Sequence, residues 1–129
     1  MTNNEFSESF IKTAKHILKE AQLLMQEGIW HLVVRRCQEC VELCLKSLLR
    51  KSGIDVPHVH DVGFLFKKHE DRFNHLPIEK LISISRRLRE EREISLYGDD
   101  LTETPPEDLY SEADAKQSLE DSQFVIDLL

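Results

Sequence analysis

The pattern of hydrophobic and polar positions is strongest between residues 30 and 51, and the rest of the chain is interpreted around that stretch. Apolar side chains recur there at helical spacing, at Trp30, Val33, Val34, Cys37, Val41, Cys44, Leu45 and Leu48, with Leu32, Cys40, Leu43 and Leu49 widening the stripe on both flanks. So wide an apolar surface requires cover on more than one side. The pattern therefore predicts the central helix of a bundle, covered by neighbouring helices or by a second subunit.

A helical hairpin is predicted for the N-terminal part. A first helix is expected to begin near Ser7 or Ser9, either of which is a suitable cap, and to continue to Glu27. Gly28 ends it as a left-handed C-terminal cap. The link is so short that the central helix must return antiparallel to the first.

Two helices are predicted after the central one, beyond a loop at residues 53–60. Asp61 is expected to cap a short third helix that ends near Phe73. Pro77 is well placed as the first residue of a fourth helix, which runs to about Tyr97, where Gly98 stops it.

The C-terminal part is expected to contain a loop and one last helix. Residues 98–110 combine acids, adjacent prolines and almost no apolar side chains, which is typical of an exposed, mobile loop. Ser111 and Asp114 resemble a capping box that opens the last helix. The prediction from the pattern is a single all-α domain over residues 1–129, a bundle of four helices with an additional short helix.

Composition and charge limit the function classes. The balance of 40% hydrophobic and 32% charged residues is that of a helix-rich globular protein, and no apolar run approaches the roughly 20 residues of a membrane span. With no signal-peptide pattern at the start, we expect a cytoplasmic location. A net charge of -7 argues against general affinity for nucleic acid. A locally basic face is an alternative to a solvated helix surface at Lys80, Arg86, Arg87, Arg89 and Arg92.

Neither a metal site nor a cofactor is predicted. Cys37, Cys40 and Cys44 lie along the apolar stripe, so buried, reduced thiols are favoured over half of a zinc site. The run His58-x-His60-Asp61 offers too few ligands for a complete site. It is interpreted as the anchor of its loop.

Four stretches together resemble the HEPN domain family of prokaryotic helical proteins, over essentially the whole chain. They are GIWHLVVRRCQECVELCLKSLL, His60-Asp61-Val62-Gly63, REISLYGDD and YSEADAKQSLEDSQFVIDLL. The resemblance implies a small up-and-down bundle that dimerises and is frequently paired with a minimal nucleotidyltransferase as toxin and antitoxin. It also implies, for members that are metal-independent ribonucleases, an Arg followed four to six residues later by His.

Candidate site residues follow from this resemblance. Every histidine precedes the arginines of the fourth helix, and Tyr97 stands five residues after Arg92. Arg92, Tyr97 and Ser95 are the candidate catalytic residues, and Arg89, Arg92, Tyr97 and Asp99 are the candidate ligand-binding residues. Arginine suits a phosphate because its planar fork donates several hydrogen bonds. A phenol is a poor base at neutral pH because its ordinary pKa is about 10.

A structural interpretation of the same residues is the main alternative. Arg92 would pair with Glu39 or Glu42 of the central helix, and the ring of Tyr97 would pack over the bundle end while its hydroxyl finds a polar partner. Binding of a phosphate or nucleotide by Arg92 and Tyr97, without turnover, lies between the two interpretations.

The predicted function is that of a HEPN-like module acting through homodimerisation and through binding of a protein partner, a nucleotide or RNA, as one member of a pair with a nucleotidyltransferase. The alternative is a metal-independent endoribonuclease that uses Arg92 and Tyr97. A third hypothesis is a helical scaffold whose basic and acidic segments meet across a dimer. In it, the acidic loop from Asp99 to Asp108 screens the Arg86 to Arg92 face from polyanions as a lid.

Overall fold

The computed structural model describes residues 2–129, and the regular elements in that range are helical. They are α1 (Asn3–Glu27), α2 (Trp30–Lys51), α3 (Gly63–Lys68), η1 (Glu70–Phe73), α4 (Ile78–Glu90), α5 (Ile94–Tyr97), η2 (Pro106–Asp108) and α6 (Glu112–Ile126). Apart from one isolated bridge between Asp99 and Thr104, these residues form no β-structure. The predicted all-α class is confirmed. None of these helices has the length and hydropathy that crossing a membrane requires.

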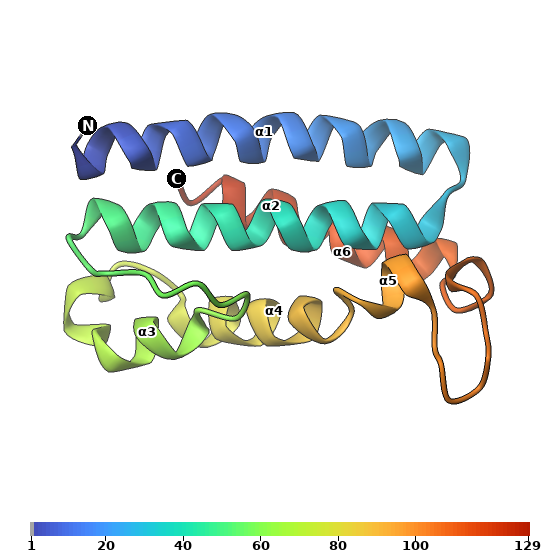
Figure 1. Cartoon of the computed structure of the whole chain (residues 1–129). Helices are drawn as coiled ribbons and strands as arrows, with labels where there is room; N and C mark the ends of the chain where they lie inside the picture. Colours follow the sequence, from blue (N-terminus) through green and yellow to red (C-terminus); the bar gives the residue numbers. More distant parts are fainter. Residues whose placement is uncertain (1) are drawn as a thin grey trace.

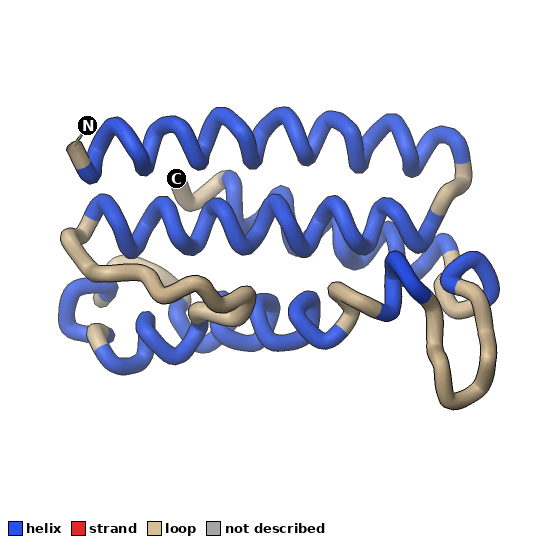
Figure 2. Tube along the Cα trace, viewed as in Figure 1, coloured by secondary structure: helices blue, strands red, loops and turns tan. Residues whose placement is uncertain are grey.

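Helix α2 lies in the middle of the molecule. Figure 1 shows α1 along one side of it, α4 along the opposite side and α6 behind it, with α1, α2, α4 and α6 running alternately in opposite directions. Figure 2 shows that the loops lie at the two ends of these helices and on the α3 side. The central position predicted for residues 30–51 is confirmed.

The surface of α2 is covered within a single chain. Its fully buried positions are Val33, Val34, Cys37, Gln38, Cys40, Val41, Cys44, Leu45, Ser47 and Leu49. The remaining positions from Trp30 to Arg50 are partly buried, and only Lys51 is exposed. The three thiols are therefore core residues, as predicted. A second subunit is not needed to cover α2, so a dimer has to be argued from other surfaces.

The start of α1 differs from the prediction. The helix begins at Asn3 and Thr2 is its N-cap, with a reciprocal capping box between Thr2 and Glu5. Ser7 is buried instead, and its Oγ lies 2.6 Å from the Oγ of Ser47 on α2. The predicted start at Ser7 or Ser9 is wrong because a serine that joins two helices has the same sequence signature as a serine that caps one.

The fourth predicted helix is broken in two. Pro77 is the N-cap of α4 rather than its first residue, and α4 ends at Glu90, before the short helix α5. The carbonyl oxygen of Arg92 accepts a hydrogen bond from Arg35 Nη1 at 2.7 Å and another from Ser95 Oγ at 3.2 Å. The prediction of one helix to Tyr97 is wrong because the Arg35 side chain of α2 bonds the Arg92 carbonyl oxygen. In a continuous helix, that oxygen would accept a hydrogen bond from the main chain of the helix itself.

The remaining boundaries agree more closely with expectation. Val62 rather than Asp61 is the N-cap of α3, yet Asp61 Oδ1 accepts hydrogen bonds from the Gly63 amide at 3.1 Å and the Ser85 hydroxyl at 2.8 Å. Asp61 thus fixes the start of α3 against α4. The Ser111–Asp114 capping box of α6 is confirmed, with both reciprocal bonds present.

Candidate functional site

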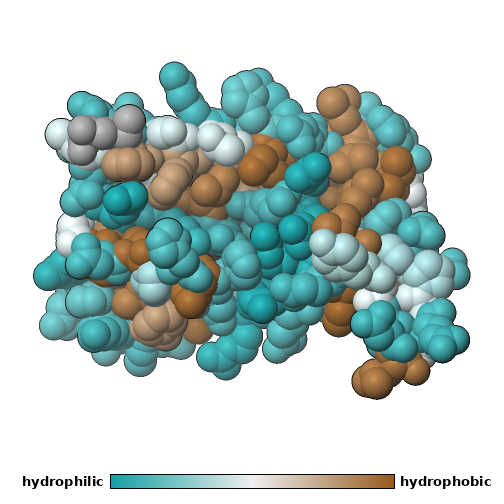
Figure 3. Space-filling view, viewed as in Figure 1, coloured by the Kyte–Doolittle hydropathy of each residue, from teal (hydrophilic) through white to brown (hydrophobic). Residues whose placement is uncertain are grey.

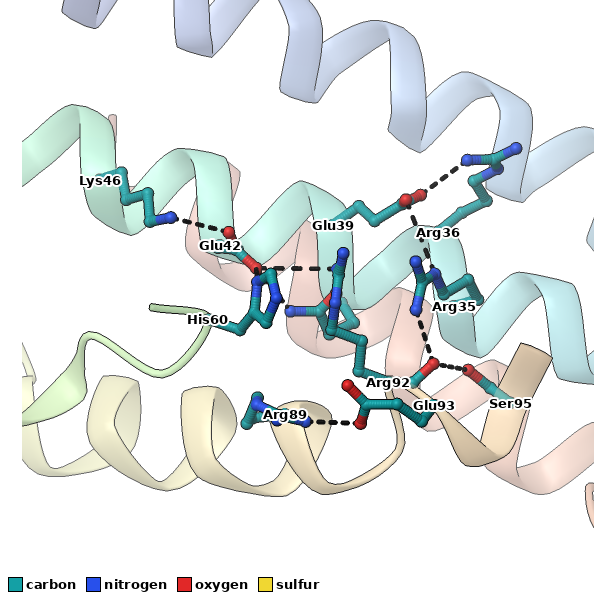
Figure 4. Close-up of polar contacts among 11 residues, drawn as sticks. Arg35, Arg36, Glu39, Glu42, Lys46, His60, Arg89, Arg92, Glu93 and Ser95 are labelled. Atoms are coloured by element: carbon teal, nitrogen blue, oxygen red, sulfur yellow. Dashed lines mark hydrogen bonds and ion pairs between the residues drawn. The ribbon is translucent and has the colours of Figure 1, made fainter. Parts of the chain in front are cut away.

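The side chain of Arg92 points from the turn between α4 and α5 toward the middle of α2 (Figure 4). Its Nη1 donates a hydrogen bond to Gln38 Oε1 at 2.6 Å and lies 3.8 Å from Glu42 Oε1. The Arg92 side chain is only 19% exposed. Of the two acids expected to pair with it, Glu42 does so.

Glu42 is the centre of this polar cluster. Its carboxylate accepts hydrogen bonds from Lys46 Nζ at 2.8 Å and Gln38 Nε2 at 2.9 Å, and it lies 3.0 Å from His60 Nδ1. Burial favours the protonated form and raises the pKa of Glu42, but the bonds from Lys46 and Gln38 and the charges of Lys46 and His60 outweigh it, so the pKa is lowered overall. Glu42 is therefore a carboxylate at neutral pH.

Glu39, the other expected partner of Arg92, belongs to a neighbouring group. It accepts a hydrogen bond from Arg36 Nη1 at 2.7 Å, and its Oε2 lies 3.6 Å from Arg35 Nε. Arg35 in turn holds the carbonyl of Arg92. Both the main chain and the side chain of Arg92 are thus fixed by α2.

The other candidate site residues do not join Arg92 in one cleft. Ser95 is fully buried under its bond to the Arg92 carbonyl. Arg89 Nη1 bonds Glu93 Oε2 at 2.7 Å on the surface. Tyr97 is 74% exposed, so the expected packing of its ring over the bundle end is wrong. Among the described residues, no hydrogen bond or ion pair links Tyr97 or Asp99 to Arg92.

His60 is the residue that sequence reasoning placed correctly as an anchor but did not connect with Arg92. The fold brings its ring to the same Oε1 atom of Glu42 that Arg92 approaches. No spacing signal marks this contact, because His60 reaches Glu42 across the loop that follows α2. In the described part of the chain, no three or more His, Cys, Asp or Glu side chains are grouped to hold a metal ion.

Large apolar side chains are exposed in α5 and just beyond it, a feature that the sequence analysis did not identify. The apolar end surface, as we name it, consists of Ile94, Leu96, Tyr97 and Leu101. Leu101 is 97% exposed, in the loop that projects beyond α5 in Figure 1, and Figure 3 shows hydrophobic atoms at the tip of this projection. Figure 3 also shows hydrophilic atoms between the tip of this projection and the body of the molecule.

The acidic loop does not act as a lid over the arginines of α4. Of its acids, Glu107 alone lies near a basic side chain in residues 2–129, with Oε1 3.8 Å from His31 Nε2. Arg87 pairs instead with Asp121 of α6. The hypothesis that the loop screens the Arg86 to Arg92 face is therefore wrong for this structure.

Comparison with known proteins identifies the fold. The HEPN domain family model matches residues 7–129. A solved structure described as that of an archaeal HEPN homologue superposes with a TM-score of 0.74, at 25% sequence identity, covering 95% of this chain and 93% of the other. Among curated proteins, no significant match is found. The family match spans nearly the whole chain, and the chain therefore belongs to the HEPN domain family.

Proposed function

We propose that this HEPN chain is an interaction module, which acts through homodimerisation and through binding of a protein partner. The observation that carries the proposal is the apolar end surface, where four large apolar side chains face water within and beside one short helix. Exposed apolar groups that gather at one place mark interaction sites more often than single ones do. Tyrosine is also enriched in protein interfaces, because it offers a large rigid ring with a polar tip.

The state of Arg92 supports binding rather than catalysis. A guanidinium that neutralises developing charge on a phosphate needs free donors. Arg92 is only 19% exposed and its Nη1 atom is committed to Gln38 and Glu42, so burial limits the access of a phosphate to its other donors, and the side chain holds the end of α4 on α2. Of the other candidate ligand residues, Tyr97 belongs to the apolar end surface and Asp99 lies beside it. We assign both to the contact between two copies of the chain; a nucleotidyltransferase is the further protein partner that the family resemblance suggests.

The mass of the chain in solution tests the homodimer. At tens of micromolar, light scattering should give about twice the 15.1 kDa of one chain. The double variant Leu96→Asp/Tyr97→Asp should give the mass of a monomer, because it buries two charges in the interface. Leu23→Asp is the matched control, since Leu23 is 58% exposed on α1, which lies on the other side of α2 from α4. A monomeric wild-type chain contradicts the proposal.

A metal-independent ribonuclease is the second candidate, and the Glu42–His60 contact favours it. Glu42 orients the His60 ring through Nδ1, while Nε2 has no partner among the described residues. An imidazole held in this way can accept the proton of a ribose 2'-hydroxyl, whose oxygen then attacks the phosphorus and displaces the 5'-oxygen of the next nucleotide. That oxygen leaves as a hydroxyl with a proton from the imidazolium or from water, and a 2',3'-cyclic phosphate remains. The geometry thus favours His60, rather than Tyr97, beside Arg92.

Cleavage of single-stranded and structured RNA in the presence of a chelator tests this candidate. If the site is catalytic, His60→Ala and Arg92→Ala should each abolish cleavage and Tyr97→Phe should leave it unchanged. Circular dichroism spectra must show that the variants remain folded. The candidate is excluded if the wild-type chain leaves both RNAs intact.

A further inference from the structure

The segment from Gly98 to Pro105 forms an ordered projection, named here the 98–105 hairpin. Asp99 and Thr104 exchange two main-chain hydrogen bonds of 2.9 and 3.1 Å across it. The Asp99 side chain also accepts a bond from the Leu101 amide at 3.0 Å. The hairpin therefore presents Leu101, almost fully exposed, on a backbone closed by these three hydrogen bonds.

Negative charge surrounds this exposed leucine. Asp99, Asp100 and Glu103 lie within two residues of Leu101, and none of them forms an ion pair in the described part of the chain. The leucine side chain, with acidic residues around it, gains little free energy from its contact with water. Its complement is an apolar hollow bordered by cations.

Such a hollow lies between α3 and α4. This α3–α4 groove has a volume of about 610 Å³, and Phe64 and Ile82 supply its apolar side chains. Phe64 is 55% exposed although it is a large aromatic residue. Lys68 and Arg86 also line the groove. Neither has an ion-pair partner among residues 2–129.

Basic side chains outnumber acidic ones in the groove, with Lys67, Lys68 and Arg86 against Asp61 and Glu79, so its net charge is positive. Asp61 accepts bonds from the Gly63 amide and the Ser85 hydroxyl. Glu79 is paired with Lys67 at 3.2 Å. Lys68 and Arg86 thus remain to meet an acidic ligand.

We propose that the 98–105 hairpin of one copy docks into the α3–α4 groove of a second copy. Leu101 would lie against Phe64 and Ile82, with the acids of the hairpin facing Lys68 and Arg86. This inference rests on the homodimer proposed above and names the surfaces that form it. A hairpin cannot fill the groove of its own chain without leaving its place, because in Figure 1 it projects beyond the opposite end of α4 from α3.

A closed dimer follows if the docking is reciprocal. The hairpin and α3 both lie on the side of α2 that faces away from α1 (Figure 1), so one two-fold axis can pair each hairpin with the partner's groove. Both complementary surfaces of each copy are then used, and assembly stops at two chains. Two hairpins and two grooves also bury more area than a single contact, as a stable interface requires.

Single substitutions on the two surfaces test the contact, with sedimentation equilibrium as the measurement. Leu101→Asp and Phe64→Asp should each raise the dissociation constant of the dimer by about tenfold or more, because each removes apolar burial from both halves of the interface. Both residues are exposed, so the fold should survive. Leu23→Asp should leave the constant unchanged. A dimer that is lost on Leu96→Asp/Tyr97→Asp but unaffected by Phe64→Asp overturns this inference and leaves the proposed homodimer intact.

Charge reversal gives a sharper test. In Asp100→Lys/Glu103→Lys, the positive hairpin of one copy would repel the positive groove of the other. In Lys68→Glu/Arg86→Glu, the negative groove of one copy would repel the negative hairpin of the other. Each double variant alone should therefore be monomeric. An equimolar mixture of the two should recover the dimer, because each hairpin then meets a groove of opposite charge. A mixture that stays monomeric, or an assembly larger than two chains, overturns the proposed reciprocal docking.

Discussion

The Nη1 atom of Arg92 lies 2.6 Å from the Oε1 atom of Gln38, and this hydrogen bond joins the end of α4 to the face of α2. Gln38 is buried and uses its amide nitrogen to bond Glu42. The glutamine thereby connects a guanidinium and a carboxylate that are 3.8 Å apart at their nearest atoms. A network in which each polar group has a hydrogen-bond partner holds the end of α4 on α2 more rigidly than one ion pair would.

Removal of Arg92 should therefore reduce stability. We expect Arg92→Ala to lower the free energy of unfolding by about 2 kcal/mol, because a charged hydrogen bond is lost and Gln38 is left without a donor in a buried site. Urea denaturation provides the measurement. Lys19→Ala is the control, since Lys19 is an exposed cation of α1 without an ion pair in the described structure; it should change the free energy by no more than about 0.5 kcal/mol. Equal effects of the two variants would contradict the structural role of Arg92.

Glu42 should make stability depend on pH in the acid range. Because the pKa of Glu42 is lower in the folded chain than the ordinary value of 4.5, its contribution is complete above about pH 4.5 and is lost as the pH falls through the folded value. The free energy of unfolding of Glu42→Gln should thus decline less steeply below that pH than that of the wild type.

Denaturation curves for both chains, compared at neutral and acid pH, provide the measurement for Glu42. Glu8→Gln is the control, because Glu8 is an exposed carboxylate of α1 for which residues 2–129 show no ion pair. Its curve should follow the wild type. Parallel pH profiles for Glu42→Gln and the wild type would show that Lys46 and Gln38 do not stabilise the charged form.

Local pattern predicted most of the fold. The bounds of α2 are those expected, since a wide apolar stripe is bracketed by Gly28 and Gly53. The end of α4 was missed for a physical reason, because the bond from Arg35 to the Arg92 carbonyl joins residues 57 positions apart. A helix end that depends on a tertiary contact leaves no trace in the periodicity of its own sequence.

The candidate site was predictable only in part. Complementary charge on the central helix predicted Glu39 or Glu42 as the partner of Arg92, and the structure identifies Glu42. The contact of His60 with the same carboxylate depends on the path of the loop after α2, which the sequence pattern does not specify. The exposure of Leu101 likewise requires knowledge of the hairpin, since a leucine within an acidic segment is equally compatible with a buried anchor.

The buried cysteines should be inert in the folded chain. Burial raises the pKa of Cys37 to about 12, against a smaller lowering by its contact with Ser122. The pKa of Cys40 is also raised, first by its contact with Cys44 and then by burial. Because the thiolate is the reactive form, a thiol reagent such as Ellman's reagent at pH 8 should label almost none of the protein until denaturant is added. Rapid labelling of the native chain would mean that α2 opens locally.

Substitution of Gly98 should disrupt the 98–105 hairpin and, with it, self-association. Gly98 has a φ of +83°, and a Cβ atom built on it would clash with the Thr104 carbonyl oxygen, so the main chain of the hairpin would have to shift. Gly53→Ala is the matched control, because Gly53 also has a positive φ, of +77°, but a Cβ atom there would meet nothing within 4 Å. Gly53→Ala should cost about 1 kcal/mol of stability and leave the mass in solution unchanged. Gly98→Ala should shift the chain toward the monomer while the far-UV circular dichroism spectrum still reports a folded helical protein. A Gly98→Ala chain that associates as tightly as Gly53→Ala would show that the hairpin conformation is not what the second copy recognises.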